Sequence, residues 1–109
     1  MASAPLFTLF PHILDDIEIP ENGTLSRVLF SSGGLRVVVF AFDEGQELTD
    51  HTAAVPAVVQ VVHGLLQLTL GDDVVEIAAD SWVHMEANLN HAVLALEPSV
   101  MLLTLQRGT

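Results

Sequence analysis

Two histidines at the ends of short apolar stretches are the residues of this chain best suited to bind a metal. His51 follows Gly45 by six residues, and His91 lies about forty residues further along, after a short polar loop. Neutral imidazole is a common protein ligand for transition metals through either ring nitrogen. Two strands whose ends meet at one mouth of a barrel would bring these side chains together.

A third histidine would complete such a site. His84 lies in the apolar stretch that leads into the His91 loop, and it would join His51 and His91 if its side chain points into the barrel. Stable metal sites mostly supply three or more ligands, and three imidazoles leave open positions on Zn, Ni, Fe, Mn or Cu. We therefore predict a divalent transition metal held by His51, His84 and His91. The alternative is three ordinary histidines, each making one hydrogen bond.

Two further residues are candidates for ligand binding. Gln60 places an amide in a valine-rich stretch, and a buried amide group without a partner costs roughly 1–3 kcal/mol. Strict alternation puts Gln60 on the face opposite Ala57, unless a bulge near Pro56 reverses the register. The competing role for Gln60 is an inter-strand hydrogen bond or a subunit contact. Trp82 shares the parity of His84 and either lines the same pocket or belongs to the core.

The elements that must position these residues are short β-strands. No stretch has a sustained helical period, and short apolar runs alternate with turn residues roughly every ten positions. This spacing predicts an all-β sandwich or barrel of eight or nine strands. A polar loop is predicted before His51. The predicted strands cover residues 13–19, 25–30, 35–42, 57–62, 65–70, 74–78, 82–85, 91–96 and 100–105.

The composition describes one acidic domain without cysteine. The chain has 109 residues, 50% of them hydrophobic, which is enough for a single core and argues against disorder. Fourteen acids against three arginines give a formal charge of −11, which disfavours nucleic-acid and membrane partners. No apolar run approaches the ~20 residues of a membrane span, and the N-terminus lacks the positive residue of a secretory signal. We therefore expect a cytoplasmic protein without disulfides.

Some strands carry more apolar side chains than one core needs. Residues 35–42, 58–62 and 100–105 are apolar on both of their alternating faces. A strand of this kind is usually covered on both sides, and an apolar face on the outside of a small barrel marks a contact with a partner. The sequence therefore predicts a homodimer.

The residues around His51 resemble the first motif of the cupins, a family of small RmlC-like barrel proteins. That motif runs Gly, five residues, His, one, His, three or four, Glu, six, Gly. Gly45, His51 and Gly64 match it, whereas Ala53 and Ala57 stand where the second histidine and the glutamate are expected.

The residues around His91 resemble the second cupin motif in spacing. That motif runs Gly, five, Pro, one, Gly, two, His, three, Asn, and here only His91 matches. The flanking segments 40–48 and 82–85 are similar to those of small single-domain bacterial cupins of unassigned function. The other four motif positions hold Asp80, Glu86, Asn88 and Ala95.

The resemblance implies an all-β cupin fold, a double-stranded β-helix or jelly-roll barrel, over roughly residues 25–105. The chain then divides into an N-terminal arm with a first strand, residues 1–24, and the cupin barrel, residues 25–109, within a single domain. Family members of this kind are typically dimers that bind one divalent metal near the open end of each barrel. Their chemistry ranges over dioxygenation, isomerisation and decarboxylation.

Two functions are consistent with these residues. In the first, the three histidines hold a metal beside a small organic ligand, as in a dioxygenase- or isomerase-like enzyme. Without the glutamate of the motif the double charge of the metal is uncompensated, which favours an anionic ligand. In the second, the protein is a metal-free ligand-binding or sensory cupin whose histidines form hydrogen bonds. No general base or nucleophile stands out beyond the histidines, so no reaction type is predicted.

Overall fold

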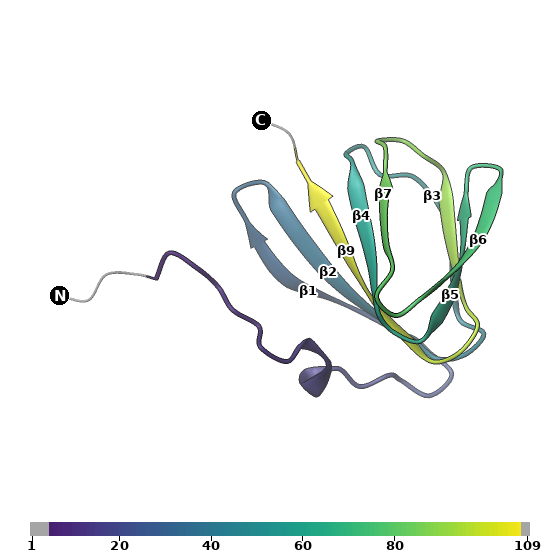
Figure 1. Cartoon of the computed structure of the whole chain (residues 1–109), viewed down its shortest axis with the longest axis horizontal. Coiled ribbons are helices and arrows are strands. Elements are labelled where there is room, and N and C mark those ends of the chain that lie inside the picture. Colours follow the sequence, from purple (N-terminus) through teal and green to yellow (C-terminus); the bar gives the residue numbers. More distant parts are fainter. Residues whose placement is uncertain (1–4, 108–109) are drawn as a thin grey trace.

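The chain folds into two β-sheets that face each other (Figure 1). The computed structural model describes residues 5–107, apart from the side chains of residues 50 and 51. In this range a short 3-10 helix, η1 (Ile13–Asp16), precedes nine strands, and no helix is long and apolar enough to cross a membrane. The strands are β1 Thr24–Ser32, β2 Leu35–Phe42, β3 Glu47–His51, β4 Ala57–His63, β5 Leu65–Leu70, β6 Asp73–Ala78, β7 Trp82–Met85, β8 His91–Ala95 and β9 Ser99–Gln106.

The strands pair in an order that differs from their order in the chain. The five-stranded sheet runs β1-β2-β9-β4-β7 and the four-stranded sheet runs β3-β8-β5-β6. Every neighbouring pair is antiparallel. Figure 1 shows the β3–β4 and β7–β8 connections at the same end of the two sheets, which we call the mouth. The all-β prediction is confirmed, and the end of β3 and the start of β8 lie at this mouth.

Two segments differ from the predicted elements. Residues 13–19, predicted as a strand, contain η1 instead. Ile13 in this turn and Ile17 just after it both pack on the five-stranded sheet. Glu47–His51, predicted as a loop, forms β3 at the edge of the four-stranded sheet. Polar residues are common on edge strands, since one side of the strand faces solvent. The other predicted strands are present, with ends that differ by at most two residues.

The main core lies between the two sheets. It is formed by alternate residues of each strand, so that Phe42, Val59 and Met101 from one sheet meet Leu66 and Val93 from the other. Each of these side chains is almost completely removed from solvent. Burial of one such side chain is worth about 1.5–3 kcal/mol, which makes this cluster the main source of stability.

A second cluster lies on the outer face of the five-stranded sheet, the face turned away from the four-stranded sheet. Val39, Ala41 and Val100 are buried there beneath Ile13 and Ile17 of the N-terminal arm, which we define as residues 5–19. The prediction that strand 35–42 is covered on both faces is therefore confirmed for its second half. The chain itself provides the cover over this part of the outer face.

Gly64 closes the end of the barrel opposite the mouth. Its φ is 93°, and a Cβ at this position would overlap the Oγ of Ser99 and the carbonyl oxygen of Pro98. The buried Ser99 hydroxyl accepts a hydrogen bond from the N–H of Leu65 at 3.0 Å and donates one to the carbonyl oxygen of Glu97 at 2.7 Å. The glycine that matches the cupin motif therefore has a structural reason to be there, which is close packing of two turns.

Candidate functional site

His91 is a polar side chain that the fold places inside the mouth. It begins β8 and is 5% exposed, and it shares its strand face with the core residues Val93 and Ala95. Its Nδ1 lies 3.0 Å from the carbonyl oxygen of Leu89. Because a carbonyl oxygen only accepts, Nδ1 carries the proton of this bond, and the lone pair of the neutral ring is then on Nε2. Histidines that bind metals or ligands are commonly oriented by such a carbonyl.

The loop before His91 is tied to the segment that follows β3. Asn88 has a φ of 68°, and its N–H donates to the carbonyl oxygen of Ala53 at 2.7 Å. Asn90 contributes its carbonyl oxygen to the N–H of Gly71 at 2.8 Å. Asparagine tolerates this left-handed backbone better than most residues. These bonds hold the two stretches that resemble cupin motifs next to each other at the mouth.

His51 lies opposite His91 in the pairing of β3 with β8. The Cα atoms of the two residues are partners, after an irregularity in the register between Leu48 and His51. The side chain of His51 lies outside the described residues. The backbone thus brings the two motif histidines onto adjacent strands at one mouth, whereas the role of His51 as a metal ligand stays a prediction.

The residues described at the mouth do not form a complete metal site. Ala57 is buried against the main core and Ala53 is half-buried, and neither side chain can coordinate an ion. Among the described residues, no group of three or more His, Cys, Asp or Glu side chains is placed to hold a metal. His51 and His91 alone supply two nitrogens, fewer than a tightly held metal requires. The donor set among the described side chains is therefore incomplete for a permanently bound metal.

His84 and Trp82 lie on the outer face of the five-stranded sheet. Val83 and Met85 of the same strand pack against the main core, so alternation turns the other two side chains outward. His84 is exposed, Trp82 is 61% exposed, and their rings stack with centroids 6.5 Å apart. Trp82 and His84 point to the same side of β7, as predicted. However, the structure does not bring His84 together with His91, because the two occupy opposite faces of the barrel wall.

Gln60 also lies on the outer face. It is exposed, whereas Ala57, Val59 and Val61 of the same strand are buried in the main core. The register irregularity in β4 comes after Val61 and does not reverse this alternation. Gln60 pairs with Trp82 across β4 and β7, and the two line a surface hollow of about 600 Å³. The predicted ligand-binding residues thus come together, but outside the barrel.

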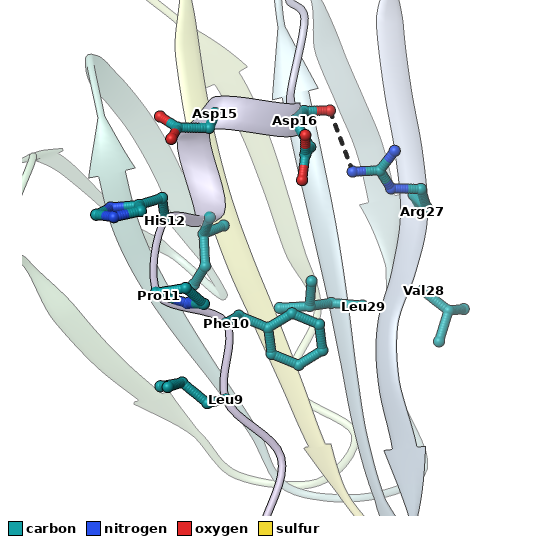
Figure 2. Close-up of a pocket in the computed structure, with 10 residues that line it drawn as sticks. Leu9, Phe10, Pro11, His12, Asp15, Asp16, Arg27, Val28 and Leu29 are labelled. Carbon is teal, nitrogen blue, oxygen red and sulfur yellow. Dashed lines mark hydrogen bonds between the residues drawn. The ribbon is translucent and has the colours of Figure 1, made fainter.

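The N-terminal arm creates two larger hollows that the sequence did not predict. One, of about 790 Å³, lies between residues 9–16 and residues 27–29 (Figure 2). Figure 2 shows Phe10 beside Leu29 and the Arg27 guanidinium pointing to the carbonyl oxygen of Asp16, to which its Nη2 donates at 3.3 Å. The other, of about 670 Å³, lies between residues 5–10 and the outer face. The sequence feature that could have indicated these hollows is the run of large apolar residues, 6–10, in the segment predicted as an N-terminal arm.

Asp43 lies just after β2, away from the mouth. Its carboxylate accepts hydrogen bonds from the N–H groups of Asn22 at 2.7 Å and Glu44 at 2.9 Å. These bonds, the one from Asn22 first, lower the pKa of Asp43 below its ordinary value of 3.8. Asp43 therefore fixes the turns that precede β1 and follow β2, which is a structural role.

Comparison with known proteins rests on structure. No protein-family model matches the chain, and no curated protein matches its sequence. A conserved protein of unknown function from Streptococcus pyogenes is 27% identical, with a TM-score of 0.82 over 100% of this chain and 92% of the other. A cupin superfamily protein from Desulfitobacterium hafniense is 20% identical, with a TM-score of 0.84 over 95% of this chain and 94% of the other.

A third match adds a relative of different length. A cupin 2 conserved barrel domain protein from Leptotrichia buccalis is 25% identical and has a TM-score of 0.80, over 87% of this chain and 46% of the other. Together with the two-sheet topology, these matches confirm the predicted cupin-type barrel and the resemblance to small bacterial cupins of unknown function.

Proposed function

We propose that this small cupin-family protein binds a small organic anion at the mouth of its barrel, with His91 as a residue that contacts the ligand. The observation that supports this most directly is a buried imidazole, oriented by the Leu89 carbonyl, at the rim of an apolar interior. A fixed polar group beside apolar side chains is a usual feature of small-molecule sites, where it sets the orientation of the ligand.

An anion fits this mouth better than a cation. Among the described residues, the buried polar or charged side chains are His91 and Ser99, so no buried carboxylate is there to repel an anion. Ala57 occupies the position where the cupin motif has its glutamate, which removes one negative charge. Because Nδ1 of His91 is engaged by the Leu89 carbonyl, Nε2 donates to a carboxylate oxygen when it carries a proton as well, and such a charge-assisted hydrogen bond is strong.

Binding, rather than catalysis, is the function proposed. The Ser99 hydroxyl is engaged with Leu65 and Glu97 at the opposite end of the barrel from His91. Of the two buried polar side chains among the described residues, His91 is therefore the one at the mouth that could act as a general base. Recognition rests on His91, on His51 as a predicted second contact, and on the backbone groups of the mouth.

A weakly held divalent metal is the second candidate. It is favoured by the backbone pairing of His51 with His91, which places the two motif histidines on neighbouring strands. Two imidazoles would bind such an ion weakly, unless an anionic ligand supplied the remaining donors. When bound, the metal would supply Lewis-acid polarisation of the ligand.

The ligand proposal is tested by NMR titration of the ¹⁵N-labelled protein with small mono-, di- and 2-oxocarboxylates. We expect shifts of amide signals in residues 53–57 and 88–91, and a loss of affinity of about tenfold or more in His91→Ala. His84→Ala is the matched control, because its imidazole lies on the outer face, and it should bind within about twofold of the parent. If no carboxylate shifts the mouth, or if His84→Ala binds as weakly as His91→Ala, the proposal is wrong.

The metal candidate is tested separately by titrating Zn, Ni and Fe(II) into the protein without a metal-affinity tag. Binding should be lost in His51→Ala and in His91→Ala, and should weaken as the pH falls, because only neutral imidazole coordinates. His84→Ala should bind metal like the parent. A protein that takes up none of the three ions removes this candidate and leaves the ligand proposal standing.

A further inference from the structure

We propose that the tip of the β1–β2 hairpin and the end of β9 form a binding site for a phosphate group, which Arg36 and Arg107 hold. The site follows from three features of the molecule: the separation of its charges, the register of three neighbouring strands and a small hollow at the two arginines. It does not depend on what the mouth binds.

The first feature is the separation of positive from negative charge. All three arginines of the chain lie in residues 22–42 and 98–109, and these two stretches contain none of its fourteen acids. The strands within them, β1, β2 and β9, are neighbours in the five-stranded sheet. A chain of formal charge −11 therefore has three adjacent strands that carry only positive charge. Because charges more than about 10 Å away are largely screened at about 0.1 M salt, the local arginines decide what binds there.

The second feature is the register of these strands, which brings two of the arginines together. Figure 1 shows the β1–β2 hairpin and the end of β9 at the same end of the sheet. Arg36 pairs with Leu105, and the N–H of Arg107 donates to the carbonyl oxygen of Gly34 at 2.8 Å, which continues the same ladder. Arg36 and Arg107 are therefore diagonal neighbours, with Cα atoms about 7–8 Å apart. Alternation directs both side chains to the face of Leu105.

Gly34 makes this close approach possible. Its φ is 83°, and a Cβ at this position would lie only 2.9 Å from the carbonyl oxygen of Arg107. A side chain at position 34 would therefore push the Arg107 backbone away from the hairpin. The turn glycine thus has the effect of placing the second arginine beside the first.

The third feature is a hollow of about 110 Å³ at the tip of the hairpin. Both arginines line it together with Leu35, two serines and two glycines, and none of the lining residues is acidic: Ser31, Ser32, Gly33, Gly34, Leu35, Arg36 and Arg107. Neither guanidinium forms a hydrogen bond or an ion pair with another residue in the described part of the chain. Like charges on neighbouring strands destabilise a sheet, and a bound anion removes this repulsion.

The donors at this hollow suit a tetrahedral oxyanion. A guanidinium presents its N–H donors in a planar fork that binds phosphate or carboxylate oxygens in pairs. One guanidinium already satisfies the two oxygens of a carboxylate, whereas two guanidiniums and two serine hydroxyls offer donors to all four oxygens of phosphate. At about 110 Å³ the hollow is smaller than the roughly 300–1,000 Å³ of a pocket for a whole organic ligand, so it takes the anionic group alone.

The proposal is tested by titrating inorganic phosphate into the ¹⁵N-labelled protein in about 0.1 M NaCl. The chain has three arginines and no lysine, so three arginine Nε–H signals in the NMR spectrum report on all its cationic side chains. We expect saturable shifts of the Arg36 and Arg107 signals with a dissociation constant of about 1 mM or below. Arg27, whose guanidinium donates to the carbonyl oxygen of Asp16, should show none. Equal and unsaturated shifts of all three signals would indicate a general salt effect and overturn the proposal.

Three variants with the same change of charge identify the residues. Arg36→Gln and Arg107→Gln should each weaken phosphate binding about tenfold or more, whereas Arg27→Gln is the matched control and should bind within about twofold of the parent. Arg107 is exposed just after β9, so Arg107→Gln tests the site even if circular dichroism shows that Arg36→Gln does not fold. If Arg27→Gln binds as weakly as the other two variants, net charge explains the binding and the proposal is wrong.

Other anions and one variant at the mouth define the ligand and separate the two sites. Methyl phosphate that binds like inorganic phosphate assigns the site to phosphate esters, and binding of the inorganic ion alone assigns it to free phosphate. Acetate that binds as tightly as phosphate overturns the choice of a tetrahedral anion. His91→Ala should bind phosphate like the parent, because His91 lies on the four-stranded sheet. Phosphate shifts confined to residues 53–57 and 88–91 would overturn this proposal and leave the one for the mouth standing.

Discussion

The inner and outer faces of the five-stranded sheet are built from the same strands but have different chemistry. On the inner face, Phe42, Val59 and Met101 are almost completely buried and form the main core. On the outer face, the residues under the arm are buried, whereas Gln60 and Trp82 remain exposed. The inner face stabilises the fold, and the outer face carries the unusual side chains that the sequence first suggested for a site inside the barrel.

This difference shows how much depends on the parity of one short strand. Turning β7 over would move His84 and Trp82 into the barrel and expel Val83 and Met85. In the structure Val83 and Met85 face the interior, where their side chains need no hydrogen bonds. The rings of Trp82 and His84, which carry N–H groups, stay in contact with solvent. Among the described side chains, His91 is therefore the histidine that lies in the interior.

The largest test of the comparison exchanges aromatic residues on the two faces for alanine. Phe42→Ala should lower the free energy of unfolding by about 3–5 kcal/mol, because it leaves a cavity between the sheets. Trp82→Ala should change it by less than about 1 kcal/mol, because the side chain is 61% exposed. Urea unfolding followed by far-UV circular dichroism gives both values, since Trp82 fluorescence is lost in one variant. Similar losses in both would mean that the outer face also stabilises the monomer.

A second test concerns two of the three places where the chain passes from the five-stranded to the four-stranded sheet. Gly64 and Gly45 both have positive φ, but only Gly64 would place a Cβ against other atoms, those of Pro98 and Ser99. Gly64→Ala should therefore lower the free energy of unfolding by at least about 2 kcal/mol. Gly45→Ala should cost about 1–2 kcal/mol, from backbone strain alone. Equal losses would show that strain, and not close packing, explains both motif glycines.

Most of the fold was predictable from the sequence because it depends on local patterns. Alternation of apolar residues and Gly, Asn or Asp turns located the strands that pair within the sheets, including β2, β5 and β7, at their observed bounds. Strand β3 escaped prediction because its pairing with β8 is a backbone interaction that polar side chains do not reveal. The arm escaped because η1 packs on a sheet face that only the folded chain creates.

The candidate site was predictable only in part. The spacing of the cupin motifs brought His51 and His91 to one mouth, since spacing along the chain sets which strand ends meet. The inward or outward direction of His84 was not predictable. Strand β7 has only four residues, and the two that share one face, Trp82 and His84, include one largely apolar and one polar side chain, so either face could be turned inward. The groove near Gln60 was missed because it forms between residues far apart in the chain.

The smallest expected effect on stability comes from Asp43, which lies away from the mouth, where the turn before β1 meets the end of β2. The Asp43 carboxylate is ionised when it accepts from Asn22 and Glu44, so its pKa is lower in the folded than in the unfolded chain. The stability that it contributes is therefore fully present above its ordinary pKa of 3.8 and is lost as the pH falls through the lowered folded value. Urea unfolding of Asp43→Asn and of the parent should differ at neutral pH and converge in acid. Glu44→Gln, which removes the neighbouring exposed carboxylate, is the control, and the difference in its unfolding free energy from the parent should not disappear in acid in this way. If both variants show the same pH dependence, the effect comes from net charge and not from these two hydrogen bonds.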